Sequence, residues 1–366
     1  MNIDLTRVPG HYNGKECFVH ARACALDENR LILTMQLLNV AGSDVFSDLF
    51  VLRSEDCGRT WSEPVQDPAF RMESGDPDIR RAGCDGTHLL HKATGTPIVL
   101  GHEVYYSPGG LKPLEGNICR RTWYSTYDLE KGCYRQADVI ALPPEFDSYR
   151  HLGSGCTQFI EEEDGTLLVP IYMTAMGEKQ SKCAVMRCRL DGTKLIFVEM
   201  SDFLEYTDVR GIGEPSIVKY GGKYYLTIRS DSHGLWAVSD DGMHFTEPTV
   251  WHWDNGTELP NYNTQQHWMT LGGKLYLVYT RKAGNNDHVF RHRAPLFAAE
   301  VDTDTMTIRR HTEEIVIPER GARLGNFGVT NINDHLAVVT VNEWMQPRGC
   351  EKFGSDNALW VARVTV

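Results

Sequence analysis

The stretch SEDCGRTW, residues 54–61, is a turn of serine, acidic residues and glycine that ends in threonine and tryptophan. Serine and aspartate side chains can bond back to their own backbone, and glycine supplies a positive φ. Thr60 and Trp61 then resume an extended, half-buried strand. The pattern returns at SDDGMHF, residues 239–245, again directly after an apolar strand. A hairpin turn that recurs after apolar strands predicts a repeating β fold.

Helical periodicity is nearly absent from the chain, and short β-rich runs alternate with Gly, Asp and Asn turns. Examples are GGKYYLTIRS at 221–230 and GGKLYLVYTR at 272–281. Aligned leading strands start near Arg22, Ala82, Gly153, Gly213, Thr264 and Gly325. Six units of about four strands predict an all-β fold, one six-bladed β-propeller domain spanning residues 1–366. We expect the last strand, NALWVARVTV at 357–366, to pair with an N-terminal segment.

Two other β architectures fit the patterns less well than a propeller. A parallel β-helix would repeat with a much shorter period. A pair of β-sandwiches would not repeat its turn chemistry. In a propeller the innermost strands converge on a central channel, so residues near their starts are expected to share one small pocket.

The composition excludes several classes of partner and cofactor. The 366 residues carry a net charge of −12, which argues against nucleic acid and anionic membranes as partners. No apolar run approaches the roughly 20 residues that span a bilayer. The opening MNIDLTRVPG does not resemble a signal peptide, so we expect a cytoplasmic protein. The ten cysteines form no CxxC pair, so neither a metal nor another cofactor is expected, and the thiols are expected to be free.

At this point the sequence resembles the sialidase (neuraminidase) family of six-bladed propellers. The S-x-D-x-G-x-T-W turn is similar to that family's Asp-box, also called the BNR repeat. The strand ARACAL, residues 21–26, is similar to the family's "(F/Y)RIPAL", which implies that Arg22 contacts a substrate carboxylate. The segment before the first turn places Asp44 at the family's acid/base position.

The fourth leading strand carries the closest likeness. GEPSIVKYGGKYYLTIRS, residues 213–230, resembles the family's "NExxVVxLxDGxLxLNxRS". The resemblance implies that Glu214 is the carboxylate beside the nucleophile and Arg229 the second arginine of a carboxylate clamp. Arg293 falls in the place of the third. Guanidinium groups bind carboxylates bidentately and stay charged at working pH, although each arginine taken alone is more often a surface residue.

The sixth leading strand departs from the family. It reads NFGVT, residues 326–330, with Asn326 where the family has its nucleophilic tyrosine. An amide cannot form the glycosyl–enzyme bond that a tyrosine makes. We therefore expect a divergent member that is a poor sialidase and forms no tyrosyl adduct, with Arg323 and Asn326 binding a sugar instead.

Two further residues are candidates for proton transfer. His267 lies at the start of the fifth inner hairpin and is singled out as a proton-transfer group, against the alternative of a structural histidine. Tyr262 is a candidate replacement nucleophile or acid, against the alternative of local loop packing.

Three functions remain open from the sequence. The first is a carbohydrate-active enzyme, a sialidase-like exo-glycosidase acting on a terminal acidic sugar of an oligosaccharide or polysaccharide. The second is a polysaccharide lyase acting on a uronic-acid-containing glycan, with His267 or a tyrosine as the base. The third is a non-catalytic glycan-binding propeller. Released products separate them, because elimination leaves an unsaturated sugar; the sugar, its linkage and the oligomeric state are left open.

Overall fold

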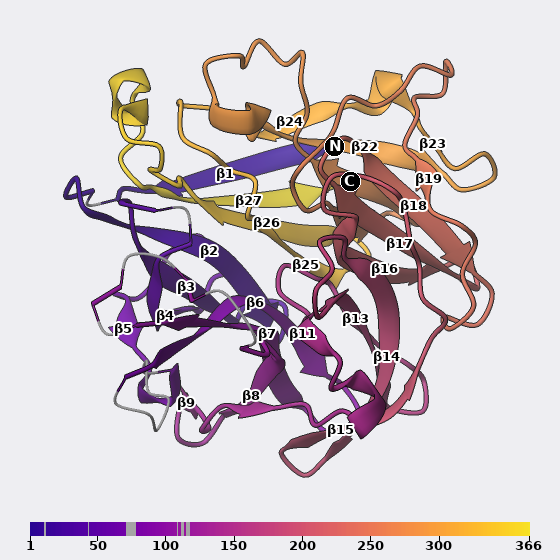
Figure 1. Cartoon of the computed structure of the whole chain (residues 1–366). Coiled ribbons are helices and arrows are strands. Elements are labelled where there is room, and N and C mark those ends of the chain that lie inside the picture. Colours follow the sequence, from indigo (N-terminus) through magenta and orange to yellow (C-terminus); the bar gives the residue numbers. More distant parts are fainter. Residues whose placement is uncertain (11, 43, 71–77, 108, 111–112, 115–117) are drawn as a thin grey trace. The chain divides into compact units, whose positions relative to one another are not determined.

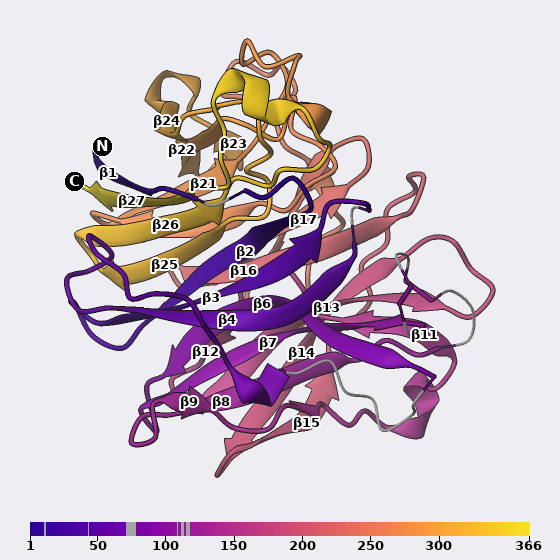
Figure 2. The same cartoon turned by 90° about the vertical axis from the view of Figure 1, so that its left-hand side faces the viewer.

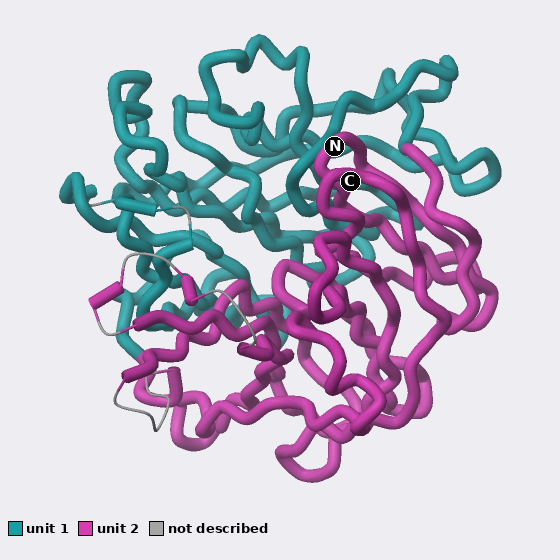
Figure 3. The backbone as a smooth tube through the Cα atoms, viewed as in Figure 1, with its two compact units in different colours: residues 1–66, 251–366 teal, residues 67–250 magenta. Residues whose placement is uncertain are grey.

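The protein is described by a computed structural model covering residues 1–366 except 11, 43, 71–77, 108, 111–112 and 115–117. The described chain forms two compact units, unit 1 (residues 1–66 and 251–366) and unit 2 (residues 67–250), coloured separately in Figure 3. Each unit contains three antiparallel sheets of four or five strands. In the described ranges no helix is long and apolar enough to cross a bilayer.

Unit 1 holds the first, fifth and sixth sheets along the chain, named blades 1, 5 and 6. Blade 1 comprises β2 (Glu16–Ala25), β3 (Leu31–Asn39), β4 (Phe46–Ser54) and β5 (Val65–Gln66). Blade 5 comprises β20 (His267–Leu271), β21 (Lys274–Tyr279), β22 (Leu296–Asp302), β23 (Thr307–Ile308) and β24 (Glu314–Ile317). Blade 6 comprises β25 (Gly328–Asn333), β26 (Leu336–Asn342), β27 (Leu359–Thr365) and β1 (Asn2–Val8). The 3₁₀ turns are η3 (Phe290–His292), η4 (Arg310–Thr312) and η5 (Cys350–Phe353).

Unit 2 holds blades 2, 3 and 4. Blade 2 comprises β6 (Arg80–His91), β7 (Thr96–Tyr106), β8 (Thr122–Asp128), β9 (Cys133–Tyr134) and β10 (Asp138–Val139). Blade 3 comprises β11 (Tyr149–Gly153), β12 (Ile160–Glu161), β13 (Thr166–Ala175), β14 (Lys182–Asp191) and β15 (Lys194–Met200). Blade 4 comprises β16 (Ile212–Tyr220), β17 (Lys223–Ser230), β18 (Gly234–Ser239) and β19 (Thr249–Val250). The 3₁₀ turns are η1 (Pro68–Phe70) and η2 (Pro144–Phe146).

The succession of six antiparallel sheets confirms the predicted fold class, a six-bladed β-propeller. The prediction that residues 1–366 form one domain stays a prediction.

The two ends of the chain meet in blade 6. Strand β1 pairs antiparallel with β27, with Asn2 opposite Thr365 and Val8 opposite Leu359. Figures 1 and 2 both show the two strands side by side. Arg363 on β27 reaches across the pair, and its Nε donates to Asp4 Oδ2 at 2.9 Å. The predicted pairing of the last strand with an N-terminal segment is confirmed.

The two turns that revealed the repeat are built alike. Ser54 Oγ donates to Asp56 Oδ1 at 2.9 Å and accepts from the N–H of Gly58 at 2.8 Å. In the second turn Ser239 Oγ donates to Asp241 Oδ1 at 2.9 Å and accepts from the glycine that follows it, also at 2.9 Å. The two glycines have φ of 79° and 78°, a conformation that a Cβ disfavours. Each turn links the third and fourth strands of its sheet.

The hydrophobic core of each unit lies between neighbouring sheets. In unit 1, one cluster around Phe327 joins blades 5 and 6, and another around Val361 joins blades 1 and 6. In unit 2, a cluster around Val169 joins blades 2 and 3, and one around Leu226 joins blades 3 and 4. This burial is the main favourable term for each unit and fixes where each first strand begins.

Candidate functional site

The first strands of blades 1, 2 and 4 each contain an irregularity. The ladder between first and second strands shifts register between Val19 and Arg22 in blade 1, as it does in blades 2 and 4. Such a bulge lifts residues off the ladder and redirects their side chains. When the first strands of the six blades are aligned, one position next to this bulge holds, in blade order, His20, Asp85, Cys156, Glu214, Asn263 and Asn326. All six are residues with polar or reactive side chains.

Five of these six residues adopt a left-handed backbone. The φ angles are 58° for His20, 58° for Asp85, 60° for Cys156, 47° for Glu214 and 51° for Asn263. A residue with a Cβ in this region costs on the order of 1 kcal/mol or more, and such strain gathers at functional sites. Polar or reactive residues in a strained conformation at the same point of the sheets therefore mark candidate positions in each unit.

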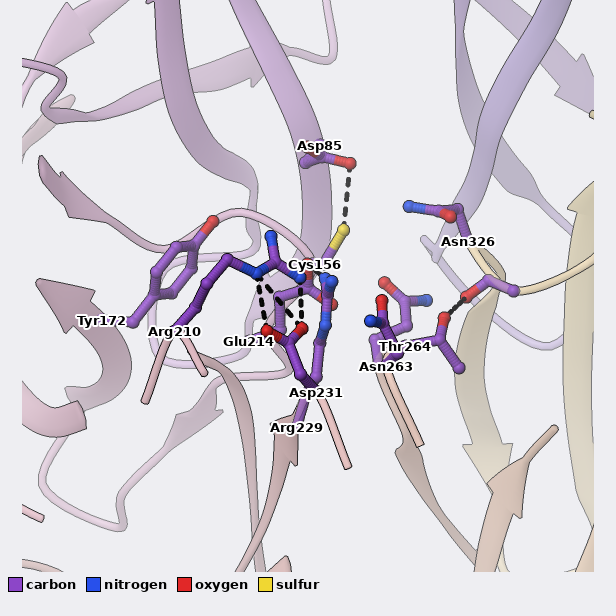
Figure 4. A network of polar contacts seen from close by, with 12 residues as sticks. Asp85, Cys156, Tyr172, Arg210, Glu214, Arg229, Asp231, Asn263, Thr264 and Asn326 are labelled. Atoms are coloured by element: carbon purple, nitrogen blue, oxygen red, sulfur yellow. Dashed lines mark hydrogen bonds and ion pairs between the residues drawn. The ribbon is translucent and has the colours of Figure 1, made fainter. Parts of the chain in front are cut away.

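In unit 2 the positions of blades 2 and 3 are joined by a thiol–carboxylate bond. Cys156 Sγ donates to Asp85 Oδ1 at 2.9 Å (Figure 4). His102 Nδ1 lies 3.6 Å from Asp85 Oδ2 and 3.4 Å from the hydroxyl of Tyr172. Burial raises the pKa of Tyr172 well above its usual value, and the Glu214 charge adds to this effect. Tyr172 is therefore held as a neutral phenol.

Glu214 and Arg229, both predicted site residues, form an ion pair in unit 2. Arg210 binds Asp231 through Nε at 2.8 Å in the same region (Figure 4). Hydrogen bonding from Arg210 lowers the pKa of Asp231, with a further contribution from Arg229. Two arginines thus face two carboxylates, and their charges balance within the protein.

Arg22 and His267 are buried in unit 1. Arg22 is 1% exposed, and its guanidinium donates to Phe327 O at 3.1 Å and to Gln265 Oε1 at 2.9 Å. His267 is 0% exposed and packs edge-on against the Phe327 ring at 5.0 Å. Burial, with the Arg22 charge, lowers the pKa of His267 well below its usual value. These contacts tie blades 1, 5 and 6 together, and they favour a structural role for both side chains.

Arg293 lies beside the corresponding position of blade 5. Its Nη2 donates to both the backbone and the side-chain oxygen of Asn263, the latter at 3.2 Å. A Cβ at Gly325 would approach Arg293 Cδ to 2.9 Å and Thr264 Oγ1 to 2.7 Å. The glycine therefore leaves the space through which the arginine passes. Thr264 Oγ1 in turn donates to Gly325 O at 3.0 Å, which joins the two blades.

Unit 1 also contains a pocket of about 500 Å³. It lies among four loops, at 251–266 between β19 and β20, at 280–295 between β21 and β22, at 318–327 before β25, and at 343–358 between β26 and β27. Its lining is cationic and aromatic and includes Arg291, Arg323, Arg348, Phe290, Trp344 and Tyr262. A concave site with aromatic faces and several guanidinium groups suits an anionic ligand with an apolar ring face.

Arg323 is the buried cation of this pocket. It is 3% exposed, and its guanidinium carbon lies 4.1 Å from the ring centroid of Trp344 and 5.2 Å from that of Phe290. The backbones of Arg323 and Trp344 form a β-bridge, which sets the stacking. Desolvation lowers the pKa of Arg323 to about 10, so the group stays charged at neutral pH. The Asp44 carboxylate acts against this shift, which places the predicted acid/base near the arginine.

Asn326 and His20 meet beside the pocket wall. Asn326 Nδ2 lies 3.4 Å from His20 Nε2. The His20 ring packs 5.3 Å from Trp344, the same indole that Arg323 covers. Asn326 is therefore close to the pocket. In blade 1 the side chain beside the pocket is that of His20, whereas Arg22, the expected first arginine, lies two residues later in the chain and is buried.

Several of these residues escaped the sequence analysis. His20, Asp85, Cys156 and Asn263 were not assigned to the site. His20 and Asp85 sit at register shifts, and Cys156 and Asn263 lie in turns outside the strands, so strand patterns do not reveal them. A signal was present: six aligned inner strands give a column of polar or reactive residues at this position. His292, whose partner is Tyr262, lies 30 residues away in another loop and carried no such signal.

Comparison with known proteins supports the fold. No family model and no curated protein matches the sequence. Among solved structures, a protein of unknown function from Dyadobacter fermentans is 14% identical with a TM-score of 0.68, covering 100% of this chain and 99% of that one. The Hadza microbial sialidase Hz136 is 13% identical with a TM-score of 0.66, covering 96% and 66%. Trypanosoma rangeli sialidase in complex with sialic acid is 14% identical with a TM-score of 0.62, covering 99% and 59%.

The chain thus spans about two thirds or less of these sialidase chains. At such identities the likeness establishes a sialidase-like propeller fold and no more.

Proposed function

We propose that this protein is a sialidase-like exo-glycosidase that acts on a terminal acidic sugar of a glycan. The observation that carries the proposal is the buried charge of Arg323. Within the described chain, its side-chain hydrogen bond goes to the neutral amide of Gln346, and its Nε has no hydrogen-bond partner. A buried charge is costly unless an opposite charge or hydrogen bonds compensate it. A ligand carboxylate in the 500 Å³ pocket would supply both.

The surrounding residues fit a sugar acid. Phe290 has 40% of its surface exposed beside the pocket, and with Trp344 it offers aromatic faces for a sugar ring. Asn326 and Arg293 offer an amide and a second guanidinium near the same loops. The sialidase neighbours, one of which is solved in complex with sialic acid, support an acidic sugar as the ligand class.

The proposal gives the predicted residues distinct roles. Asp44, exposed and near Arg323, is the general acid that protonates the leaving oxygen. Arg293, Arg323 and Asn326 hold the sugar. Glu214 and Arg229 form a charge-balanced pair within unit 2. Arg22 and His267, at 1% and 0% exposure, support the blades that carry these residues.

The test is a product screen with the wild-type protein on oligosaccharides capped by sialic acid, hexuronic acids or neutral sugars. Release of a free acidic sugar, without release from the neutral set, is the expected result. An unsaturated, ultraviolet-absorbing product would identify a lyase instead. Binding of acidic caps without any product would identify a glycan-binding propeller, and release of neutral caps alone would overturn the acidic specificity.

A further inference from the structure

Three side chains of the unit 1 pocket lie in series. The hydroxyl of Tyr262 lies 2.7 Å from Nδ1 of His292, and Nε2 of His292 lies 3.4 Å from Asp287 Oδ1. All three residues line the pocket that contains Arg323. In the tautomer whose Nδ1 accepts from the phenol, Nε2 carries the proton that faces the carboxylate. A nucleophile beside a base, with the base oriented by a third group, is the arrangement of an activated nucleophile.

The loop at 280–295 is built to hold His292 in this place. Asn286 is fully buried, and its Nδ2 donates to three backbone carbonyls, those of Arg281 at 2.9 Å, His292 at 3.3 Å and Ala294 at 2.6 Å. Arg291 and His292 both have left-handed backbones, with φ of 56° and 52°. Two successive strained residues persist only where their surroundings hold them, and such strain gathers at functional sites.

Cations surround the Tyr262 ring. The Nζ of Lys282 lies 4.3 Å from the ring centroid, and the backbone N–H of Lys282 donates to Pro260 O at 3.0 Å, which joins the two loops. Partial burial raises the pKa of Tyr262, and the charges of Arg293 and Arg291 act against that rise. The net pKa of Tyr262 stays above its usual value, so the hydroxyl keeps its proton at neutral pH and needs a neighbouring base to take it.

We propose that Tyr262 is the nucleophile of this protein, with His292 as its base and Asp287 as the residue that orients the imidazole. The inference rests on the proposed function, since it names the group that attacks the acidic sugar. The sequence led us to expect no tyrosyl nucleophile, because Asn326 stands where the family has its tyrosine. The inference replaces that expectation.

The reaction then has two balanced steps. His292 Nδ1 takes the phenolic proton, and Tyr262 Oη forms a bond to the anomeric carbon as the glycosidic C–O bond breaks. The departing oxygen takes a proton from the carboxylic acid of Asp44. In the second step water attacks the same carbon and gives a proton to the Asp44 carboxylate. The tyrosyl oxygen leaves and recovers its proton from the His292 imidazolium, so one water is consumed and two hydroxyl products form.

Tyr172 in unit 2 is the rival nucleophile. Its hydroxyl also lies near an imidazole, at 3.4 Å from His102 Nδ1, and near the Glu214 charge. That tyrosine is 8% exposed and is not among the pocket residues. The half-buried position of Tyr262 in the pocket and its shorter bond to His292 favour Tyr262.

The experiment uses the full chain and a fluorinated glycosyl fluoride of whichever acidic sugar the wild type releases. We expect peptide mass spectrometry to find the adduct on Tyr262. Tyr262→Phe should lose about 10³-fold or more in kcat and take up no label. His292→Gln should still be labelled at Tyr262, about 10²-fold more slowly, because the base and not the nucleophile is gone. Asp287→Asn should cost about threefold to tenfold in kcat, since the carboxylate is 96% exposed and screened.

Tyr206→Phe is the matched control, a half-buried tyrosine whose ring lies 6.4 Å from that of His233 in unit 2. It should keep wild-type kcat, and thermal unfolding should show that each variant is folded. An adduct on Tyr172 or another residue, or full turnover by Tyr262→Phe, would overturn the inference while the proposed function stands. Absence of wild-type turnover on every acidic substrate would instead contradict the proposed function and, with it, this inference.

Discussion

The guanidinium carbon of Arg323 lies 4.1 Å from the ring centroid of Trp344, in a pocket where its hydrogen-bonded side-chain partner is an uncharged amide. The stacking uses the planar shape of the group. Among the residues that the structure describes, no carboxylate is hydrogen-bonded to it, so its charge is available to a ligand. A lysine would keep the charge but lose the planar group that stacks on the indole and the paired N–H donors that bind a carboxylate.

Arg323→Lys should therefore weaken binding of the acidic sugar by about 10- to 100-fold, equivalent to about 1.4–2.8 kcal/mol. Titration calorimetry with the released sugar measures this change. The matched control is Arg310→Lys, because Arg310 also stacks on a tryptophan, 5.5 Å from the Trp253 centroid, outside the pocket. Equal losses in both variants would show that the effect is general packing, and unchanged binding in Arg323→Lys would remove the residue from the site.

Asp44→Asn should lower kcat by about 100-fold or more and leave KM nearly unchanged, because a general acid acts on the leaving oxygen in the transition state. Substrates with good leaving groups should lose much less, since they need no proton. Asp48→Asn is the control: its Oδ2 accepts from Gln66 Nε2 at 2.6 Å within blade 1. Wild-type kcat in Asp44→Asn would assign the acid to another residue.

Asn326→Tyr should not convert the protein into a fast sialidase. The residue lies against His20, with 3.4 Å between their nitrogens, and the surrounding loops are shaped for the amide. Release of sialic acid should stay at least about 100-fold below that of an enzyme with its nucleophile correctly placed. Initial rates of Asn326→Tyr and Asn326→Phe give the comparison, since only the first adds a hydroxyl. Fast turnover in Asn326→Tyr alone, with a tyrosyl adduct at position 326, would contradict the prediction.

Asp56→Asn should lower the free energy of unfolding by about 1 kcal/mol at neutral pH, after allowance for screening at a partly exposed turn. Partial desolvation opposes ionisation of Asp56, but hydrogen bonds from Thr60 and Ser54 outweigh it and hold the pKa at about 2. A depressed folded pKa stabilises the protein above the unfolded value of about 3.9 and loses that effect as pH falls through the folded value. Denaturant midpoints of wild type and variant should therefore converge toward pH 2, and a gap constant with pH would contradict the assignment.

The repeat itself was readable from the sequence. Serine, aspartate and glycine act on their own neighbours in the chain, so the turns at Ser54 and Ser239 could be recognised without any long-range contact. Alternation along 357–366 likewise predicted the strand that pairs with β1. The predicted starts of the six leading strands lie within six residues of the observed ones, which run from Glu16 for β2 to Gly328 for β25.

The sequence by itself thus determined the sheet count, the turn chemistry and the closing strand, because each depends on local patterns. Tertiary structure alone decided which side chains lie together. A register shift between Val19 and Arg22 turns His20 off the ladder and leaves Arg22 buried against Gln265. The hydrophobic periodicity of the strand does not reveal such a shift. Tyr262 and His292 meet only because two loops pack together, and a contact of that kind is set by the fold of the blades.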